Sequence, residues 1–577
     1  MNSSVTRRAA LKAIATAAVG VGAAGVRAAR ATPAPDRYVV DTSTVDVSSL
    51  SGMEVRYDFG ERLGFAVVSG PESRLPSGGV YARGMDVEIE VPRQEEAAVD
   101  AREVEDPFYR LQWDKREQRV KRVHTLEGER GAGARIGIVD DGVLGANPDR
   151  DAAHPDLGNV RSDLSANLTD DGNGPGPLND DHGTHCAGVA AAGENGTGVV
   201  GTAPEAEIVD LRAFSGGATS FADIVAAVVV GAAPEGTRLN LGTPDRPRVF
   251  HGAGCDVLNL SVGTPPLVPV PVVDEDGDGD VADELPDLPD PYVPVPARDL
   301  ALLGAFVSAA GAFAVGVGAL PVASAGNSAV DLGAEVDLPR GSAPPVVLPA
   351  GAPGYLSVGA TGPIGFGWPA NGDSDTVAGV EVEAETDYEL PPEEVAFYSN
   401  YGAGAVDVTA GGGNFDTDTV DDDVEVRPNS FLDLVFNTGI ANLDPDRPND
   451  AVLDEYVPGY AFKAGTSFAA PNVSGLAALL YAADPDATPL AVRRRIEATA
   501  RPLRVGRAGQ TTAPGVTPNV ADDDRFDGDR PSNPASLDGR TLDPERYRGE
   551  GHYDVAAALA GFGGDGDDDA DGETGDD

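Results

Sequence analysis

Short apolar segments that stop at a polar residue constrain the fold of this chain more than any other feature of its sequence. Residues 136–139 read Ile-Gly-Ile-Val and end at Asp140, which is followed by Asp141 and Gly142. Residues 322–326 are small and uncharged and end at Asn327. Such strands are typical of parallel sheets, which carry their functional groups at the carboxyl ends of the strands. The sequence therefore predicts an α/β fold with a site at that edge.

Two further segments supply a hydroxyl and an imidazole. Ser467 lies in Gly-Thr-Ser-Phe-Ala-Ala-Pro (465–471), just before a run that looks helical, and His182 begins a run of small residues that suits a buried helix. Taken alone, Ser467 is more often a helix cap, His182 a packed histidine and Asp140 a turn residue. Together they predict nucleophilic catalysis, because a serine hydroxyl needs a general base and a third group that orients the base.

The order Asp, His, Asn, Ser along these segments resembles the subtilisin-like serine proteases, and it is the order found in subtilisin itself. The resemblance covers about residues 105–562 with interruptions, and it implies a three-layer α/β/α sandwich. It assigns Asp140 as the group that orients the base, His182 as the base, Asn327 as the oxyanion donor and Ser467 as the nucleophile of an endopeptidase. His185 matches a structural position of the histidine motif.

The same resemblance implies residues that bind a protein or peptide substrate. Asp141 and Cys186 are similar to the kexin branch of the family, so a processing protease with narrow specificity stays open as an alternative. A catalytically silent binding protein is the other alternative, although all four site positions are intact. The implied substrate-binding residues are Ser261, Gly263, Ser215, Gly216 and Ala325.

Two loops suit a structural calcium ion, because hard cations prefer oxygen ligands on glycine-containing loops. Residues 194–199 resemble the tight calcium loop of the family, and the second loop alternates carboxylates over 274–281. Leu285 stands where an EF-hand has its glutamate, so a merely solvated acidic loop is an equal alternative there. The expected ligands are Asp156, Asn195, Gly193, Thr197 and Val199 for the first loop, and Asp274, Asp276, Asp278 and Asp280 for the second.

The charge of the chain is strongly acidic, with 42 basic against 94 acidic residues and a net charge of −52. That balance excludes nucleic acid as a partner. Lysine is nearly absent, and the surface resembles that of halophilic archaeal secreted proteins, whose carboxylates are screened by high salt. Disorder is the competing interpretation, but 41% hydrophobic content opposes it. We expect a monomer.

The N-terminal region predicts export and maturation. Residues 1–31 carry Arg7-Arg8 before an uncharged stretch, which indicates a twin-arginine signal peptide and a secreted protein; a membrane anchor is the alternative. Strand-like alternation follows, so residues 32–104 are expected to form a small α+β propeptide that inhibits and is removed; a permanent domain is the alternative. The protease domain then spans 105–562, and 563–577 form a disordered acidic tail.

Several other features remain at the level of expectation. The uncharged stretch 300–327 predicts a buried helix and a core strand rather than a membrane span. Cys186 and Cys255 are expected to be buried thiols. Substrate specificity cannot be derived, because acidic or proline-rich surface insertions are expected near 264–298, 365–394, 414–460 and 504–548.

Overall fold

The structure is a computed structural model of the whole chain. The structure describes residues 31–88, 93–95, 108–215, 218–271, 285–366, 374–377, 380–383, 392–414, 430–444, 447–448, 450–501 and 549–563. The second predicted calcium loop, with Asp274, Asp276, Asp278 and Asp280, lies outside these ranges. Gly216 and most of the predicted signal peptide and tail also lie outside them.

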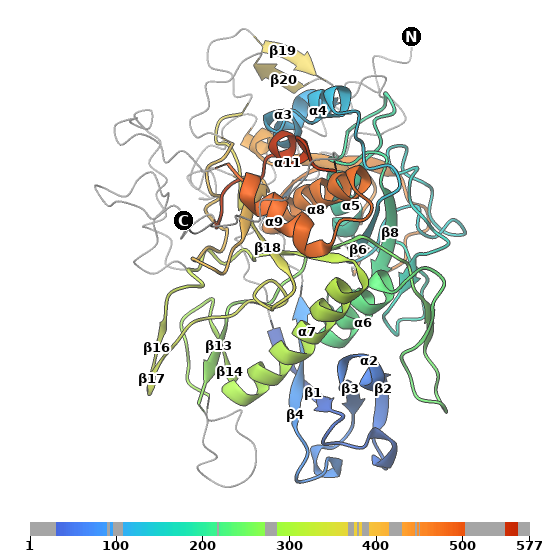
Figure 1. The fold of residues 1–577 in the computed structure, drawn as a ribbon, viewed down its shortest axis with the longest axis vertical. Helices are drawn as coiled ribbons and strands as arrows, with labels where there is room; N and C mark the ends of the chain where they lie inside the picture. Colours follow the sequence, from blue (N-terminus) through green and yellow to red (C-terminus); the bar gives the residue numbers. More distant parts are fainter. Residues whose placement is uncertain are drawn as a thin grey trace, which may run out of the picture.

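A seven-stranded sheet forms the centre of the molecule (Figure 1). All of its strand pairs are parallel, which confirms the predicted fold class. Its order is β21-β18-β15-β12-β6-β8-β7. The strands are β6 (Arg135–Val139), β7 (Ala166–Asn167), β8 (Glu207–Arg212), β12 (Val257–Leu260), β15 (Leu320–Ser324), β18 (Leu356–Thr361) and β21 (Val408–Gly411).

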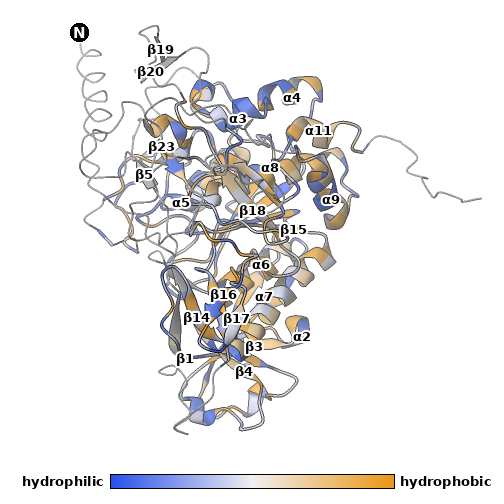
Figure 2. Ribbon diagram, turned by 90° about the vertical axis from the view of Figure 1, so that its left-hand side faces the viewer, coloured by the Kyte–Doolittle hydropathy of each residue, from blue (hydrophilic) through white to orange (hydrophobic). Residues whose placement is uncertain are grey.

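Helices cover both faces of this sheet and divide the core into two large clusters. Ile136 and Ile138 of β6 pack in the cluster with the helix residues Ala187 and Phe468, whereas Val139 packs in the other cluster. This alternation is the period of two that a strand imposes on its side chains. The centre of the molecule is accordingly rich in hydrophobic residues (Figure 2). The helices of the first face are α5 (His182–Ala191) and α8 (Thr466–Ala483), and those of the second are α6 (Phe221–Ala232) and α7 (Ala297–Val317).

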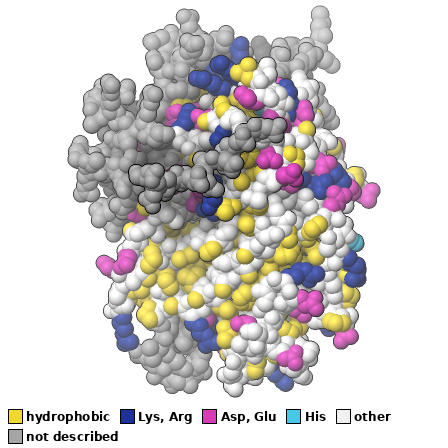
Figure 3. Space-filling model, in the orientation of Figure 1, with side chains coloured by type: hydrophobic (Ala, Val, Ile, Leu, Met, Phe, Trp, Pro, Cys, Tyr) yellow, Lys and Arg dark blue, Asp and Glu magenta, His cyan; other side chains and the backbone are white. Residues whose placement is uncertain are grey.

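Helix α7 corresponds to the uncharged stretch that was expected to be a buried helix, and β15 is the core strand after it. Among the described helices, α7 is long and apolar enough to cross a membrane by length and composition. Its Leu303 and Phe306 are buried, whereas Ala305 and Val317 are exposed, so the helix lies in the outer layer with one face toward solvent. Hydrophobic side chains gather over this region of the surface (Figure 3).

A second sheet lies beneath α6 and α7 and is built mainly from the N-terminal region (Figure 1). Strands β1 to β4 lie in the region where strand-like alternation is predicted. The ring of Phe306 on α7 packs on Phe59 and Phe65 of this region. Its last strand comes from the protease region, because Asp86–Glu88 pair antiparallel with Ala218–Ser220. The order is β2 (Glu54–Asp58), β3 (Phe65–Ser69), β1 (Ala31–Asp41), β4 (Tyr81–Glu88) and β9 (Ala218–Ser220), with α2 (Gly60–Leu63) after β2.

Part of the predicted surface insertion 414–460 belongs to the core instead. Strand β22 (Val435–Ile440) is buried throughout and pairs with β23 (Pro458–Ala464). Strand β5 (Arg93–Glu95) pairs antiparallel with the other edge of β23. The rings of Phe436 and Phe462 pack against each other across the two strands, with centroids 4.4 Å apart, and account for the burial of the pair. The flanking acidic and proline residues made this burial unpredictable from the sequence.

The remaining described elements are short. They are α3 (Trp113–Glu117), α4 (Val120–Leu126), α9 (Pro489–Thr499), α11 (Val555–Leu559), and the strand pairs β10 (Arg238–Asn240) with β11 (Val249–His251), β13 (Leu267–Val270) with β14 (Val293–Pro296), β16 (Val336–Leu338) with β17 (Gly341–Ala343), and β19 (Ser374–Val377) with β20 (Val380–Glu383).

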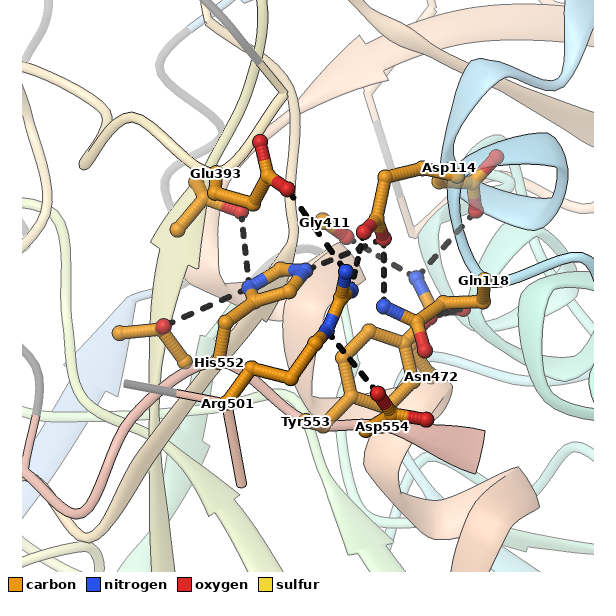
Figure 4. A network of polar contacts seen from close by, with 12 residues as sticks. Asp114, Gln118, Glu393, Gly411, Asn472, Arg501, His552, Tyr553 and Asp554 are labelled. Carbon is orange, nitrogen blue, oxygen red and sulfur yellow. Dashed lines mark hydrogen bonds and ion pairs between the residues drawn. The ribbon is translucent and has the colours of Figure 1, made fainter. Parts of the chain in front are cut away.

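A buried polar network fastens the first and last segments of the protease body to α8 (Figure 4). Asn472 of α8 donates to Gly411 O at 2.9 Å and to Asp114 Oδ2 at 3.3 Å, and it accepts from the Tyr553 hydroxyl at 3.1 Å. Because α8 begins beside Ser467, this network holds the helix that carries the predicted nucleophile. Ion pairs beside it join Arg501 to Glu117, Glu393 and Asp554.

Candidate active site

Asp140 and His182 meet at the carboxyl end of β6. Asp140 is the residue after the strand, and its Oδ1 accepts a hydrogen bond of 2.7 Å from His182 Nδ1. Both side chains are buried, and Asp140 Oδ1 also accepts from the backbone N–H of Asp141 at 2.8 Å. A carboxylate bound to Nδ1 fixes the ring and its tautomer, so the other nitrogen, Nε2, is left as the base.

Asp141 caps the start of helix α5. Its carboxylate accepts from the backbone N–H groups of Gly183 at 2.7 Å and His182 at 3.3 Å. A Cβ at Gly183 would lie 2.7 Å from the carbonyl oxygen of Gly142, so glycine is required for this close approach. Burial and the neighbouring carboxylates Asp180 and Asp140 raise the pKa of Asp141.

Ser467 lies in the first turn of α8, as predicted, near the positive end of the helix dipole. Its hydroxyl donates to the carbonyl oxygen of Ser261 at 3.3 Å. Its own carbonyl oxygen accepts from Ser261 Oγ at 2.6 Å and from the Cys186 thiol at 3.4 Å. Ser467 therefore both donates a hydrogen bond to Ser261, which follows β12, and accepts one from it.

The structure brings Ser467 and His182 into one site without a hydrogen bond between them. His182 Nε2 is buried and has no hydrogen-bond partner within the described residues. The thiol of Cys186, 3.4 Å from the Ser467 carbonyl oxygen, is also 4.0 Å from His182 Nδ1, so the same buried group contacts both residues. Hydrogen bonds between a catalytic serine and its base are often long or poorly aligned in substrate-free structures and tighten when substrate binds.

Asn327 is held beside Ser467, the predicted nucleophile, by Thr466, the residue before that serine. Asn327 Oδ1 accepts from the backbone N–H of Thr466 at 2.9 Å and from its hydroxyl at 2.8 Å. Because the oxygen of the amide is engaged, the amide nitrogen is the end that can act as a donor toward a substrate. The turn that carries it is supported by Asn400, which donates to Ala325 O at 2.9 Å and leaves no room for a side chain at Gly326.

The predicted substrate-binding residues are partly brought together. Ser261 contacts Ser467 directly, as described above, and Gly263 lies nearby, where an added Cβ would be 3.4 Å from Val347. The Ala325 carbonyl oxygen accepts a hydrogen bond from Asn400 Nδ2, so one of its acceptor positions is occupied within the fold rather than directed to a substrate. Ser215 follows β8 and is half-buried, and Gly216 lies outside the described residues.

Two of the predicted ligands of the first calcium loop, Asn195 and Val199, contact the buried carboxylate of a third, Asp156. Gly193 N–H donates to the backbone carbonyl oxygen of Asp156, and Thr197 N–H donates to Asn195. Asp156 Oδ2 accepts from the Tyr460 hydroxyl at 2.8 Å and from Val199 N–H at 3.0 Å, and Oδ1 accepts from Asn195 Nδ2 at 3.3 Å. These partners are all neutral, and burial raises the pKa of Asp156 to about 6. The groups that the structure places against this carboxylate are hydrogen-bond donors, so binding of a calcium ion would require Asn195 to turn its oxygen toward the ion.

The sequence analysis did not predict the buried ion pair of Lys463 with Asp181, which lies next to His182 in the chain. Lys463 of β23 is fully buried and forms an ion pair with Asp181, the residue before the histidine. The scarcity of lysine is the one sequence signal that could have pointed to Lys463, because a rare lysine in a chain rich in arginine invites a specific role. His185 is buried against Thr438 O at 3.0 Å, in agreement with a structural role, and Cys186 and Cys255 are free buried thiols.

Comparison with known proteins agrees with this geometry. A sequence profile of the Subtilase family matches residues 131–528, which is well over half of the chain. The chain belongs to the subtilase family. The matched segment holds all four predicted site residues of this subtilase and the central sheet that positions them.

The individual relatives match this subtilase over shorter segments. Thermitase from Thermoactinomyces vulgaris is 36% identical over 126 residues, which are 21% of this chain and 41% of the relative. Subtilisin DY from Bacillus licheniformis is 31% identical over 143 residues, 24% of this chain and 40% of the relative. The chain thus spans less than half the length of these curated relatives.

Solved structures share the fold of this subtilase at low sequence identity. The epidermin leader peptide processing serine protease from Staphylococcus aureus has a TM-score of 0.52 at 17% identity and covers 92% of this chain and 98% of its own. Fervidolysin from Fervidobacterium pennivorans has a TM-score of 0.50 at 18% identity and covers 92% of this chain and 61% of its own. At such identity the similarity concerns the fold alone.

Proposed function

We propose that this subtilase is a secreted serine endopeptidase that uses Ser467, His182 and Asp140 as a catalytic triad. The observation that carries the proposal is the buried 2.7 Å hydrogen bond from His182 Nδ1 to Asp140, with Ser467 at a helix start in the same site. A serine-directed fluorophosphonate tests it, because the reagent reacts only with an activated serine. Mass spectrometry of the treated protein should find the fluorophosphonate adduct on Ser467. If folded protein carries no adduct, a catalytically silent binding protein is favoured instead.

The chemistry follows from these positions. On substrate binding, the Ser467 hydroxyl leaves the Ser261 carbonyl, gives its proton to His182 Nε2 and attacks the carbonyl carbon of the peptide. Asp140 stabilises the imidazolium that forms, and Asn327 donates to the oxyanion. The imidazolium then protonates the departing amine, which leaves an acyl-enzyme on Ser467. Water activated by His182 hydrolyses that ester and restores the serine.

Replacement of Asn327 by alanine should lower kcat by about 10²–10³ with little change in KM, a magnitude established for the corresponding donor in subtilisin. The amide acts on the oxyanion, so its removal affects the transition state more than the bound substrate. Steady-state kinetics on a peptide ester measures this. Thr466→Val is the comparison variant, because it removes the hydroxyl that binds Asn327 and accepts from the Gly326 N–H but leaves the Asn327 amide in place, so a smaller loss is expected. A loss below tenfold in Asn327→Ala would show that another group binds the oxyanion.

The N-terminal region supports a zymogen. Strands β4 and β5 pair with β9 and β23, which lie on the protease side, and in the whole chain Ser467 is 5% and His182 1% exposed. We infer that residues 1–31 direct export by the twin-arginine route, that 32–104 form the inhibitory propeptide and that 105–562 form the mature protease domain.

A processing protease with narrow specificity is the second candidate. The observation in its favour is the group of carboxylates at the start of α5, where Asp180 and Asp141 both lie within 3.3 Å of the backbone N–H of His182. Such a negative site favours basic substrate side chains. Cleavage of casein at many sites supports a broad endopeptidase, whereas cleavage confined to peptides with basic residues before the scissile bond supports the processing enzyme.

Calcium is proposed as a structural ion at the Asp156 loop, where it would be held by Asp156, Asn195 and the loop carbonyls. It would compensate a buried charge whose hydrogen-bond partners are neutral. Excess EGTA at fixed salt should lower Tm by several degrees, because removal of a bound ligand destabilises the folded state. Asp156→Asn should abolish the effect of EGTA. An unchanged Tm in the wild type would show that the Tyr460 hydrogen bond suffices.

A further inference from the structure

Strand β2 of the N-terminal region contacts the protease body through Arg56 and Tyr57, which are neighbours in the chain. Both side chains reach Asp223 in the first turn of α6, although successive side chains of a regular strand point to opposite faces. A β-bulge accounts for this, because the pairing of β2 with β3 shifts between Val55 and Tyr57 and passes over Arg56. The bulge thus turns an arginine and a tyrosine toward the same carboxylate of the protease body.

The carboxylate of Asp223 is bound on both of its oxygens. Arg56 Nη2 donates to Oδ1 at 3.0 Å and to Oδ2 at 2.9 Å, and the Tyr57 hydroxyl lies 2.8 Å from Oδ1. Ser220, which caps α6, donates to Oδ2 at 2.7 Å. Among the described residues, every hydrogen bond to Oδ1 therefore comes from the N-terminal region. Asp223 is 4% exposed in the whole chain, so removal of residues 32–104 uncovers it.

Two loops of the protease body complete the surroundings of this carboxylate. The Tyr57 hydroxyl lies 2.6 Å from Leu168 O, and the guanidinium of Arg248 lies over the Tyr57 ring at 4.2 Å from its centroid. Asp170 pairs with Arg248 at 2.8 Å and with Arg56 at 3.1 Å. These groups offer two carboxylates to a guanidinium and a cation to an aromatic face, so they suit an arginine followed by a tyrosine. The Asp223 site comprises Leu168, Asp170, Asp223 and Arg248.

We propose that the Asp223 site recognises Arg56 and Tyr57 and keeps the N-terminal region bound to the protease body after the chain is cleaved near residue 105. The proposal deepens the proposed zymogen and rests on it. The occupant of the site is the segment 54–58 of this chain, whose backbone is also held, because Asp58 N–H donates to Leu241 O at 2.8 Å. Changes to an interface act mostly on the dissociation rate, so loss of these contacts speeds release. The Asp223 site therefore sets how long the cleaved enzyme stays inhibited.

Salt distinguishes the Asp223 site from another ion pair of the same strand. Arg246 pairs with Glu54 at 2.7 Å, but the two side chains are 71% and 64% exposed. The side chains of Arg56 and Asp223 are only 20% and 5% exposed. Salt screens exposed charges strongly and buried pairs much less, and an exposed pair contributes little in any case. The Asp223 site is therefore expected to hold the N-terminal region in molar salt, whereas the pair of Arg246 with Glu54 is not.

The test is the lag between cleavage and the onset of peptide hydrolysis in the full chain at molar salt. Intact-mass spectrometry dates the cleavage, and a peptide substrate reports the activity. Tyr57→Phe should shorten the lag about tenfold, because it removes a hydroxyl that bonds a charged group. Arg56→Met should shorten it at least as much, because it leaves Asp223 buried without its counter-ion. Both substitutions lie in residues 32–104, so the mature enzyme has the same sequence in every sample.

Two further substitutions in the N-terminal region are matched controls. Tyr81→Phe removes a hydroxyl that donates to Glu72 at 3.1 Å within the N-terminal region, so its lag should equal that of the wild type. Glu54→Gln removes the exposed pair with Arg246 from the same strand, and its lag should also be unchanged at molar salt.

Asp223→Asn tests whether Arg56 acts through that carboxylate. It should shorten the lag by itself, and addition of Arg56→Met should shorten it little further, because both substitutions remove the same ion pair. If Arg56→Met does not fold, Tyr57→Phe and Asp223→Asn decide.

Wild-type lags in Tyr57→Phe and Arg56→Met would overturn the proposal. Equal shortening in Tyr81→Phe would also overturn it, because the cause would then be a general loosening of the N-terminal sheet. A wild type that is active without cleavage, or with no lag after it, would do the same. A chain that never hydrolyses peptide would instead refute the proposed function.

Discussion

Replacement of Ser467 by alanine is expected to abolish peptidase activity and to leave the N-terminal region attached. The hydroxyl of Ser467 is the group that would form the acyl-enzyme, and maturation would use the same nucleophile in cis or in trans. In subtilisin, loss of the nucleophile lowers kcat by about 10⁶-fold, and an effect of that order is expected here. Hydrolysis of a peptide substrate and the intact mass of the purified protein measure the two consequences.

Ser308→Ala is the control for this substitution. Ser308 donates to Gly304 O at 2.6 Å within α7, away from His182 and Asp140, so its loss should leave both activity and maturation unchanged. Correct maturation of Ser467→Ala protein, produced without other subtilases, would show that a different protease removes the N-terminal region. Residual hydrolysis within tenfold of the wild type would contradict the assignment of the nucleophile itself.

Dialysis to low salt is expected to unfold and inactivate the mature enzyme. The chain has 94 acidic against 42 basic residues, and repulsion among so many like charges opposes the compact state. Arginines are shared among carboxylates: Arg135 pairs with Glu207 at 2.7 Å and with Glu235 at 3.0 Å. Repulsion among the remaining carboxylates is screened over about 3 Å at 1 M salt and over about 10 Å at 0.1 M.

Activity and circular dichroism after a day in 0.1 M NaCl with millimolar calcium measure this expectation. Because calcium is present at the same concentration in both samples, a loss of both signals is attributable to the lower concentration of NaCl. A parallel sample in molar NaCl is the control and should keep both signals. Full retention at 0.1 M would refute the salt requirement and would leave the acidic residues as a solubility feature only.

Much of the site was predictable because each of its residues lies at the end of a recognisable element. Asp140 follows an apolar strand, His182 begins a helix of small residues, and Ser467 lies in the first turn of an apolar helix. Strand and helix periodicity depends on near neighbours in the chain, so it is readable without a partner. The parallel sheet followed from the same apolar strands.

Other features depend on contacts between segments far apart in sequence. Burial of Lys463 depends on its ion pair with Asp181, and the Tyr460 hydroxyl reaches Asp156 only because β23 lies beside that loop. The hairpin of β22 and β23 looked like a surface insertion, since its buried aromatic residues are flanked by acidic segments. Nothing in a single segment indicates which distant group will compensate a buried charge.

The sequence by itself determined the chemical types of the site and the elements that carry them, because local patterning sets where a strand ends and where a helix begins. Only the tertiary structure decided that Asp140 binds His182, that Thr466 holds Asn327 and that Ser467 bonds to Ser261 before any substrate is present. The physical reason is that these bonds are short and directional, so they form only when packing of the two cores brings distant element ends within about 3 Å.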